Sequence, residues 1–358
     1  MSLDNLNKIS EAKGLHVCAS HFSDRTGYYP RGGRTLSEII GLRDTNPFLV
    51  VCGLRDPLTF NLNLNTADGS ANLPVDTEAG VKSYSHEQYM GFVKQAQPDL
   101  CLSLSDDIPR TVKLGKKRKS KAQKRTAEWL EKSVQDFEVT PQSRELDAVG
   151  LVGSILASED AEENVRQARL TSQLASGPSV VGYAIMGLGL GESSEARRRA
   201  LSSICSKLSK DKMRYASGQS TPVDLLQAIE CGIDVVDATF VNELTESGHA
   251  MVFPIDGVKP DGGATSTLPF NLNLWSNEYI HDQRPISETC GCYTCRNGFS
   301  RGYIHHLLQC RELLVQVLLE IHNTHHMCHF MKEVREKIVS GEFSQYSKDF
   351  QKMYNQLY

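Results

Sequence analysis

Short runs of apolar, β-branched residues alternate with longer polar stretches of helical period through the middle of the chain. The first two runs are Phe48–Cys52 and Leu100–Leu104. Three strand-then-helix pairs follow, with strands expected at Ala148–Leu156, Ser179–Met186 and Lys212–Ser217 and helices at 159–175, 192–208 and 221–232. Regular alternation with short connections predicts βαβ units and a parallel sheet.

Glycines cluster where these predicted strands end. They are Gly187, Gly189, Gly191 and Gly218. Such residues suit loops at the carboxyl edge of a barrel, so a TIM-like (β/α)8 barrel is the favoured fold class. A doubly wound open sheet is the structural alternative, but no G-x-G-x-x-G segment opens a helix after an early strand, and GLGLGE has the wrong spacing.

The remaining segments divide the chain into three predicted parts. Residues 1–255 form the barrel core, with an insertion at 110–145 in which a basic loop leads into a helix at Ala127–Phe137. Residues 256–289 are rich in turn formers and are expected to be a surface connection. Residues 290–358 form a C-terminal module that is helical from Ser300 onward. One buried face is predicted there, made of Tyr303, Leu307, Leu314, Leu318 and Ile321.

Composition is that of an ordinary globular protein, with 40% hydrophobic and 23% charged residues among 358. No run of about 18 apolar residues occurs and the first residues lack a signal-peptide core, so we expect a soluble intracellular protein. The net charge of −4 gives no global attraction to a polyanion. A local basic stretch either contacts phosphates or is a solvated loop. It contains Lys113, Lys116, Lys117, Arg118, Lys119, Lys121, Lys124 and Arg125.

Three of the ten cysteines crowd into a C-x-C-x-x-C segment made of Cys290, Cys292 and Cys295. This spacing favours a metal site over disulfides, and a histidine from the following helical region would complete a closed Cys3His zinc site. Spacing does not choose the fourth ligand among the nearby histidines, which are His305, His306, His322, His325, His326 and His329. Free thiols on a loop are the alternative.

The segments ETCGCYTCRNGFSRGYIHHLL, LLEIHN and REKIVSGEFSQYSKDF resemble the C-terminal zinc module of the queuine tRNA-ribosyltransferases, also called tRNA-guanine transglycosylases. The likeness runs from about residue 146 to the C-terminus and includes AIMGLGLGE and GIDVVDATF. It selects His322 as the fourth ligand. It also implies a (β/α)8 barrel, one Zn²⁺ per chain and exchange of guanine for queuine at position 34 of tRNAs with GUN anticodons.

The same resemblance places the family's covalent nucleophile on Asp237, at a strand end. The family's D-S-G-G-[FY]-Q segment, which supplies the general base, is missing, and VCGLRDPLTFNLNLN stands in its place. The family's P-T-R segment is replaced by FVNELTESGHA, in which Glu243 and Glu246 would repel phosphate. No residue is therefore assigned a catalytic or cofactor-binding role, and Asp237 is interpreted as a vestigial nucleophile.

The purine pocket is only partly retained in the sequence. Asp106 and Asp107 correspond to the family's base-recognising aspartate, and Gly187 and Gly189 correspond to the pocket wall. The pocket glutamine expected near Gly153 is replaced. Relative to the family, about one strand is expected to be absent before the first residues, which would leave the barrel incomplete at its N-terminus.

A retained zinc module beside an altered active site is the pattern of the non-catalytic subunit of the family's heterodimeric enzyme. The resemblance then implies a catalytic subunit and tRNA as partners, with a homodimer as a second assembly. It also implies a location in the cytoplasm and at the outer mitochondrial membrane, without an integral membrane segment. The alternatives are an active transglycosylase that uses Asp237 and a zinc-stabilised RNA-binding protein without a role in base exchange.

Overall fold

The structure is a computed structural model, and it describes residues 3–9, 12–22, 35–42, 48–56, 72–77, 80–107, 115–138, 146, 148–219, 221–255 and 269–357. The chain forms two compact units. One spans Lys13–Asp237, and the other combines Met1–Ala12 with Ala238–Tyr358. Each unit is described by itself. Whether residues 1–255, 256–289 and 290–358 act as separate functional parts stays a prediction.

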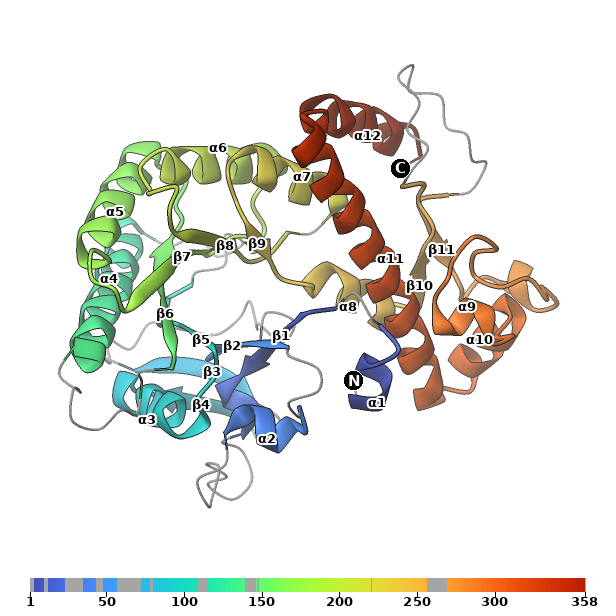
Figure 1. Cartoon of the computed structure of the whole chain (residues 1–358), viewed down its shortest axis with the longest axis horizontal. Helices are drawn as coiled ribbons and strands as arrows, with labels where there is room; N and C mark the ends of the chain where they lie inside the picture. Colours follow the sequence, from blue (N-terminus) through green and yellow to red (C-terminus); the bar gives the residue numbers. More distant parts are fainter. Residues whose placement is uncertain are drawn as a thin grey trace. The chain divides into compact units, whose positions relative to one another are not determined.

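The first unit is built on a seven-stranded parallel sheet whose strand order follows the chain. Its strands are β1 (Gly14–Cys18), β2 (Leu49–Gly53), β5 (Leu100–Leu102), β6 (Gly150–Leu156), β7 (Val180–Met186), β8 (Met213–Ala216) and β9 (Val235–Val236). Figure 1 shows the sheet curling, with the connecting helices on its outer side. A doubly wound sheet reverses its strand order at a switch point, so this order excludes that alternative.

Helices make the crossovers between successive strands. They are α2 (Leu36–Ile40), α3 (His86–Ala96), α4 (Lys116–Glu138), α5 (Ala161–Leu174), α6 (Ser194–Cys205) and α7 (Pro222–Glu230), with the short η1 (Ala19–Phe22) after β1 and an antiparallel hairpin of β3 (Leu73–Thr77) and β4 (Gly80–Tyr84) before α3. Side-chain caps fix several helix starts. Asp160 caps α5, Ser193 caps α6, and Thr221 caps α7 with Pro222 in its first turn.

The predicted βαβ pattern is confirmed over 148–232, and the strands expected at Phe48–Cys52 and Leu100–Leu104 are present as β2 and β5. The sheet is consistent with a TIM-like barrel, although no pairing between β9 and β1 closes it within the described residues. The prediction of a basic loop before Ala127 is wrong for the residues that the structure describes there, because α4 begins at Lys116. Lysine and arginine are good helix formers, so this charged stretch continues the helix backward.

Side chains from four strands fill the interior of the curled sheet. They are Leu102, Val152, Ala184 and Tyr215. Two loops at the carboxyl ends of β7 and β8 meet backbone to backbone at Gly189 and Gly218, which have φ values of 73° and 79°. A Cβ on Gly218 would lie 2.7 Å from the carbonyl carbon of Leu188, so these positions need glycine both for space and for conformation.

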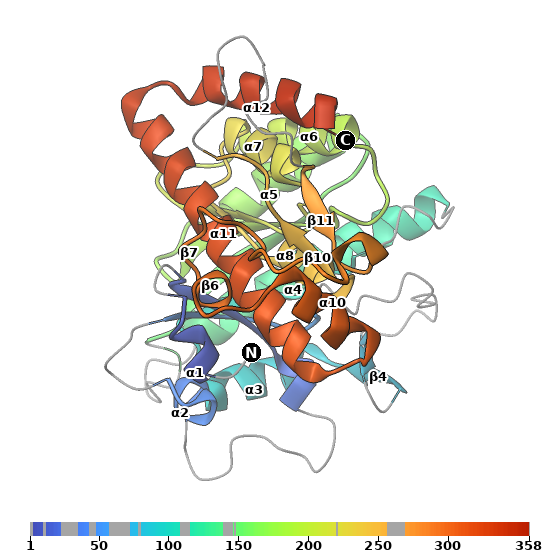
Figure 2. The same cartoon turned by 90° about the vertical axis from the view of Figure 1, so that its right-hand side faces the viewer.

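The second unit is mainly helical around a small antiparallel pair of strands, β10 (His249–Met251) and β11 (Asn271–Asn273). Its helices are α1 (Leu3–Leu6), α8 (Thr239–Glu246), η2 (Asn277–Tyr279), α9 (Tyr293–Arg296), α10 (Arg301–Gln309), α11 (Leu313–Ser340) and α12 (Phe343–Leu357). Figure 2 shows the long helix α11 running past β10, with α12 folding back from its end. None of the described helices has the length and apolar character needed to cross a bilayer.

The single buried face predicted from Tyr303 to Ile321 is partly wrong. Leu307, Leu318 and Ile321 are buried, whereas Tyr303 is 42% and Leu314 41% exposed. The helical conformation is interrupted between α10 and α11, where Arg311 adopts a φ of 55°. A break of this kind resets the helical phase, so spacings that cross it do not keep to one face.

Candidate metal centre and altered pocket

The cysteine knuckle and one helical histidine come together in the second unit. Donor atoms of Cys290, Cys292, Cys295 and His322 all lie within 4.8 Å of one another. The Nδ1 atom of His322 is 3.7, 3.5 and 3.4 Å from the three sulfur atoms in that order. A tetrahedral zinc site with bonds of about 2.0–2.3 Å has ligand-to-ligand edges of about 3.3–3.7 Å. The cluster therefore fits a metal ion that has four protein ligands.

Hydrogen bonds outside the four ligands fix the histidine. Nε2 of His322 lies 2.9 Å from the carbonyl oxygen of Met251, which leaves Nδ1 to face the sulfur atoms. The next residue, Asn323, accepts a hydrogen bond from the Met251 amide at 2.9 Å and donates one to the His249 carbonyl at 2.9 Å. Such partners orient a metal ligand and set its tautomer. One turn of α11 thus carries the candidate ligand His322 and, through Asn323, hydrogen-bonds strand β10.

The knuckle is fixed by its own backbone geometry. Cys292 caps α9, and its sulfur accepts a hydrogen bond from the Cys295 amide at 3.4 Å. The hydroxyl of Thr294 donates to the Leu318 carbonyl at 2.7 Å, which fastens α9 to α11. These contacts place the three sulfur atoms on the side of the knuckle that faces His322.

The other histidines near the knuckle have different roles. Nδ1 of His305 lies 3.0 Å from the Leu274 carbonyl oxygen. His326 packs edge-on against Phe253 at 4.4 Å between ring centroids, and His329 is exposed. Spacing could not separate these residues from His322, because side chains three or four positions apart lie on the same side of a helix.

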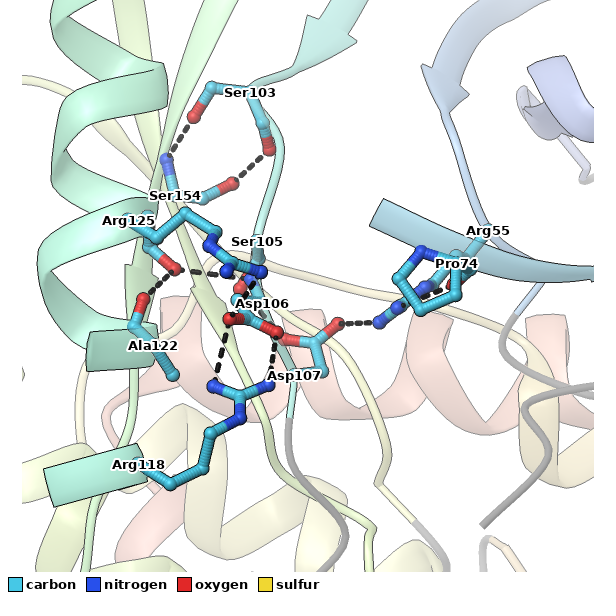
Figure 3. Close-up of polar contacts among 11 residues, drawn as sticks. Arg55, Pro74, Ser103, Ser105, Asp106, Asp107, Arg118, Ala122, Arg125 and Ser154 are labelled. Atoms are coloured by element: carbon cyan, nitrogen blue, oxygen red, sulfur yellow. Dashed lines mark hydrogen bonds and ion pairs between the residues drawn. The ribbon is translucent and has the colours of Figure 1, made fainter. Parts of the chain in front are cut away.

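The acidic pair after β5 lies in the first unit, at the carboxyl edge of the curled sheet (Figure 3). Asp106 is fully buried and receives two hydrogen bonds of 2.9 Å from the Arg118 guanidinium. Arg125 lies 3.3 Å from the same carboxylate. Both arginines belong to the basic stretch of α4, so its charge is partly used inside the protein. The paired geometry satisfies a carboxylate that would otherwise be costly to bury.

Asp107 has a different set of neighbours. The hydroxyl of Ser105 donates to its Oδ1 at 2.7 Å, and Nη1 of Arg55 lies 3.9 Å from its Oδ2. Arg55 also donates to the Pro74 carbonyl at 2.8 Å, which ties it to the β3 strand. Burial raises the pKa of Asp107 to about 6, although Arg55 and Ser105 both act to lower it. Burial also lowers the pKa of Arg55.

Arg55 and Asp107 lie beside a small cavity of about 40 Å³. Its lining includes His16, Ser103, Met186 and Tyr215. Small-molecule sites are usually about 300–1,000 Å³, whereas a space of this size holds about three waters. Among the described residues, Arg55 thus forms part of the wall of this small cavity, beside Asp107.

The remaining residues expected at the pocket are placed as follows. Asp237 follows β9 and is half-buried, with the Tyr215 hydroxyl and the Gly218 amide both 3.3 Å from its Oδ2. Gly153 faces α4, because a Cβ there would lie 3.2 Å from the Leu130 side chain. It therefore points to the helix layer and not to the sheet interior, so a pocket side chain would have to come from a neighbouring position on β6.

Sequence reasoning missed the N-terminal strand β1 and the residues around it. His16 and Cys18 lie on this strand, and Arg55 and Asp56 follow β2. The alternating apolar residues of GLHVC were the only local signal, and five residues are too few for a clear period. The pairing of β1 with β2 brings these side chains to the same edge of the sheet as Asp107.

Together, the curled parallel sheet, the strand-end acidic residues and the Cys3His knuckle define a class of barrel-like α/β protein whose C-terminal module carries a cluster that could hold a metal ion. The family profile described as "Queuine tRNA-ribosyltransferase" matches residues 50–356, which is most of the chain. The chain therefore belongs to the queuine tRNA-ribosyltransferase family.

Two vertebrate relatives are similar over nearly the whole length. The chain is 28% identical to queuine tRNA-ribosyltransferase accessory subunit 2 of Gallus gallus, over 97% of the chain and 86% of the relative. It is 29% identical to the Homo sapiens protein of the same name, over 92% of the chain and 82% of the relative. A queuine tRNA-ribosyltransferase of Fusobacterium nucleatum is 35% identical, but over only 54% of the chain and 47% of the relative.

Proposed function

We propose that the chain is the non-catalytic subunit of a heterodimeric queuine tRNA-ribosyltransferase. In this role it supports the exchange of guanine for queuine at position 34 of tRNAs with GUN anticodons. The observation that carries the proposal is the state of the acidic pair. Asp106 is bound by Arg118 and Arg125, and Asp107 faces Arg55. A purine would have to displace buried ion pairs before it could bind there, which is costly.

The names of the vertebrate relatives support the same role, since both are called accessory subunits and cover most of the chain. On this proposal the partners are a catalytic subunit and tRNA, with a homodimer as a second assembly. The protein works in the cytoplasm and at the outer face of mitochondria. The curled sheet is then part of the family's (β/α)8 barrel.

A single Zn²⁺ at Cys290, Cys292, Cys295 and His322 is part of the proposal. Four protein ligands leave no open position, so the ion stabilises the knuckle and takes no part in base exchange. The donor distances and the hydrogen bond from His322 to Met251 are the support for this assignment.

A specific feature supports the competing function, an active transglycosylase. Asp237 occupies the carboxyl end of β9 and its carboxylate faces the Tyr215 hydroxyl, in the place where a barrel enzyme carries reacting groups. The two functions differ in what Asp237 contributes to the rate, because the loss of a covalent nucleophile costs several orders of magnitude.

The test is base exchange into tRNA by the assembled two-subunit enzyme that carries Asp237→Ala. We expect activity within a few-fold of the parent and no covalent RNA adduct on this chain under denaturing conditions. The positive control replaces the matching aspartate of the catalytic subunit, which should abolish both activity and adduct. Collapse of activity in Asp237→Ala, with the native mass of the complex unchanged, would make this chain the catalyst.

A further inference from the structure

A second group of candidate metal ligands lies in the first unit, near the carboxyl ends of β1 and β2. Strand β1 ends at Cys18, and the 3-10 helix η1 begins at the next residue. His21 is the third residue of η1, and one of its ring nitrogens lies within 4.8 Å of the Cys18 sulfur. The Ser20 amide donates to the Leu54 carbonyl at 3.2 Å, which fastens η1 to the segment that follows β2.

That segment supplies the third side chain. β1 and β2 are parallel and in register, with Cys18 opposite Gly53. Asp56 lies three residues beyond Gly53, so it reaches the same end of the strand pair. A sulfur, an imidazole and a carboxylate from two neighbouring strand ends thus converge at one place.

The donor atoms have the separations that a metal requires. One ligand atom each from Cys18, His21 and Asp56 lies within 4.8 Å of the other two. Nε2 of His21 is 3.3 Å from Oδ2 of Asp56, which is the edge of a tetrahedron with bonds of about 2.0–2.1 Å. The Cys3His cluster of the second unit has edges of 3.4–3.7 Å in the same structure.

A simple ion pair would account for His21 and Asp56 but not for the buried sulfur beside them. Cys18 is 4% exposed, and its Sγ also lies 3.8 Å from Nδ1 of His16 on the same face of the strand. The S–H group is directed at the Arg55 carbonyl at 3.3 Å, a contact that thiolate formation on metal binding would release. The His21 side chain is 55% exposed, which gives an ion a path from solvent.

We propose that Cys18, His21 and Asp56 form a second divalent-metal site that takes Zn²⁺. Mixed sulfur, nitrogen and oxygen donors suit this borderline ion better than Mg²⁺ or Ca²⁺, which take oxygen ligands. Three protein ligands leave the fourth position for an exchangeable water, unlike the closed Cys3His cluster. His16 stands next to the sulfur and lines the small cavity, so it orients the cysteine and does not complete the metal's coordination.

The test counts metal in the full chain after zinc saturation and dialysis. The parent should hold about two equivalents, and Cys18→Ser, His21→Ala and Cys292→Ser should each hold about one. With Co²⁺ as probe, Cys292→Ser should keep a sulfur-to-cobalt charge-transfer band of single-thiolate intensity, and Cys18→Ser combined with Cys292→Ser should lose it. His21→Ala removes a largely exposed side chain, so it tests the site even if the buried cysteine variant fails to fold.

Cys310→Ser is the matched control, since Cys310 is an exposed cysteine that lies 3.7 Å from His306 without a third ligand nearby in the described residues. It should leave the metal count unchanged. A parent with one equivalent, or a His21→Ala variant that retains two, would overturn the second site. Loss of metal from Cys292→Ser alone reports only on the Cys3His cluster, so the two assignments fail separately.

Discussion

The knuckle at Cys290–Cys295 and the strand end at Asp106–Asp107 both gather several ionisable groups in a small buried volume. At the knuckle, three sulfur atoms and a histidine face one another in an arrangement that could hold a metal ion. At the strand end, Arg118, Arg125 and Arg55 supply the opposite charge from within the chain. The first region could take its partner from outside the chain, whereas the two carboxylates of the second already have arginine partners within it.

This difference bears on function because a buried group that already has its partner resists a new one. The Cys3His cluster lies in the segment that resembles the family's zinc module. On the proposed function, the acidic pair and its arginines stand where the family binds the substrate base. The following predictions test whether the two regions differ in this way.

The largest effect is expected from breaking the knuckle. Cys292→Ser or His322→Ala should release the bound zinc, because apparent binding energies of structural zinc sites are of the order of 10 kcal/mol and require all four ligands. Metal analysis of the purified variants measures this directly, with His305→Asn as the control that keeps its zinc. Full zinc content in both ligand variants would refute the assignment.

The buried ion pairs of Asp106 should matter more than exposed ones on the same helix. Arg118→Met leaves a fully buried carboxylate with one partner fewer, and we expect a loss of about 3 kcal/mol in the free energy of unfolding. The matched control is Lys119→Met, whose partner Glu159 is largely exposed and whose loss should cost under about 1 kcal/mol. Urea denaturation compares the two variants. Equal losses in the free energy of unfolding would show that the buried ion pair contributes no more than the exposed one.

Asp107 should make stability depend on pH. Its pKa is raised from 3.8 to about 6 in the folded protein, so the folded state binds the proton more tightly than the unfolded chain. Stability should therefore fall as the pH rises from about 4 to 6 and level off above that, by roughly 2–3 kcal/mol from this group.

The check on this prediction compares the parent with Asp107→Asn in urea titrations across that range. The asparagine variant should lack this component of the slope, whatever constant cost the change imposes on Arg55. Parallel pH profiles for the two proteins would show that burial does not raise the pKa of this carboxyl.

The smallest effect is expected on tRNA affinity. Arg118 and Arg125 are engaged with Asp106, but Lys116, Lys117, Lys119 and Lys124 are exposed on α4. If α4 contacts phosphates in the assembled enzyme, neutralising these four lysines should weaken binding similarly for all tRNAs. The slope of log affinity against log salt should fall by roughly 0.7–0.9 per lost contact.

The control for the lysine variant neutralises Lys207 and Lys210, which are exposed at the end of α6. That change should leave the slope as it was, and zinc content should be unchanged in both proteins. An unchanged slope in the α4 variant would leave this helix as a solvated face.

Much of the curled sheet was predictable because its buried strands are continuous apolar runs and its helices carry caps such as Asp160 and Ser193. The two-residue strand β9 and the polar start of α4 were not, since neither has a clear hydrophobic period. The knuckle cysteines were visible from their spacing, and His322 only from the family resemblance. The arginine partners of Asp106 and Asp107 come from positions 12 to 52 residues away, and no local pattern encodes such contacts.

The adjacent residues His322 and Asn323 couple binding of the candidate ion to the folding of strand β10. His322 faces the candidate ion while its other nitrogen contacts the Met251 carbonyl, and Asn323 holds the Met251 amide. An ion that binds only the folded arrangement stabilises everything folded with it, in proportion to the logarithm of its free concentration. Zinc supply would thus act as a thermodynamic regulator of fraying at β10, a strand that contributes no ligand to the metal.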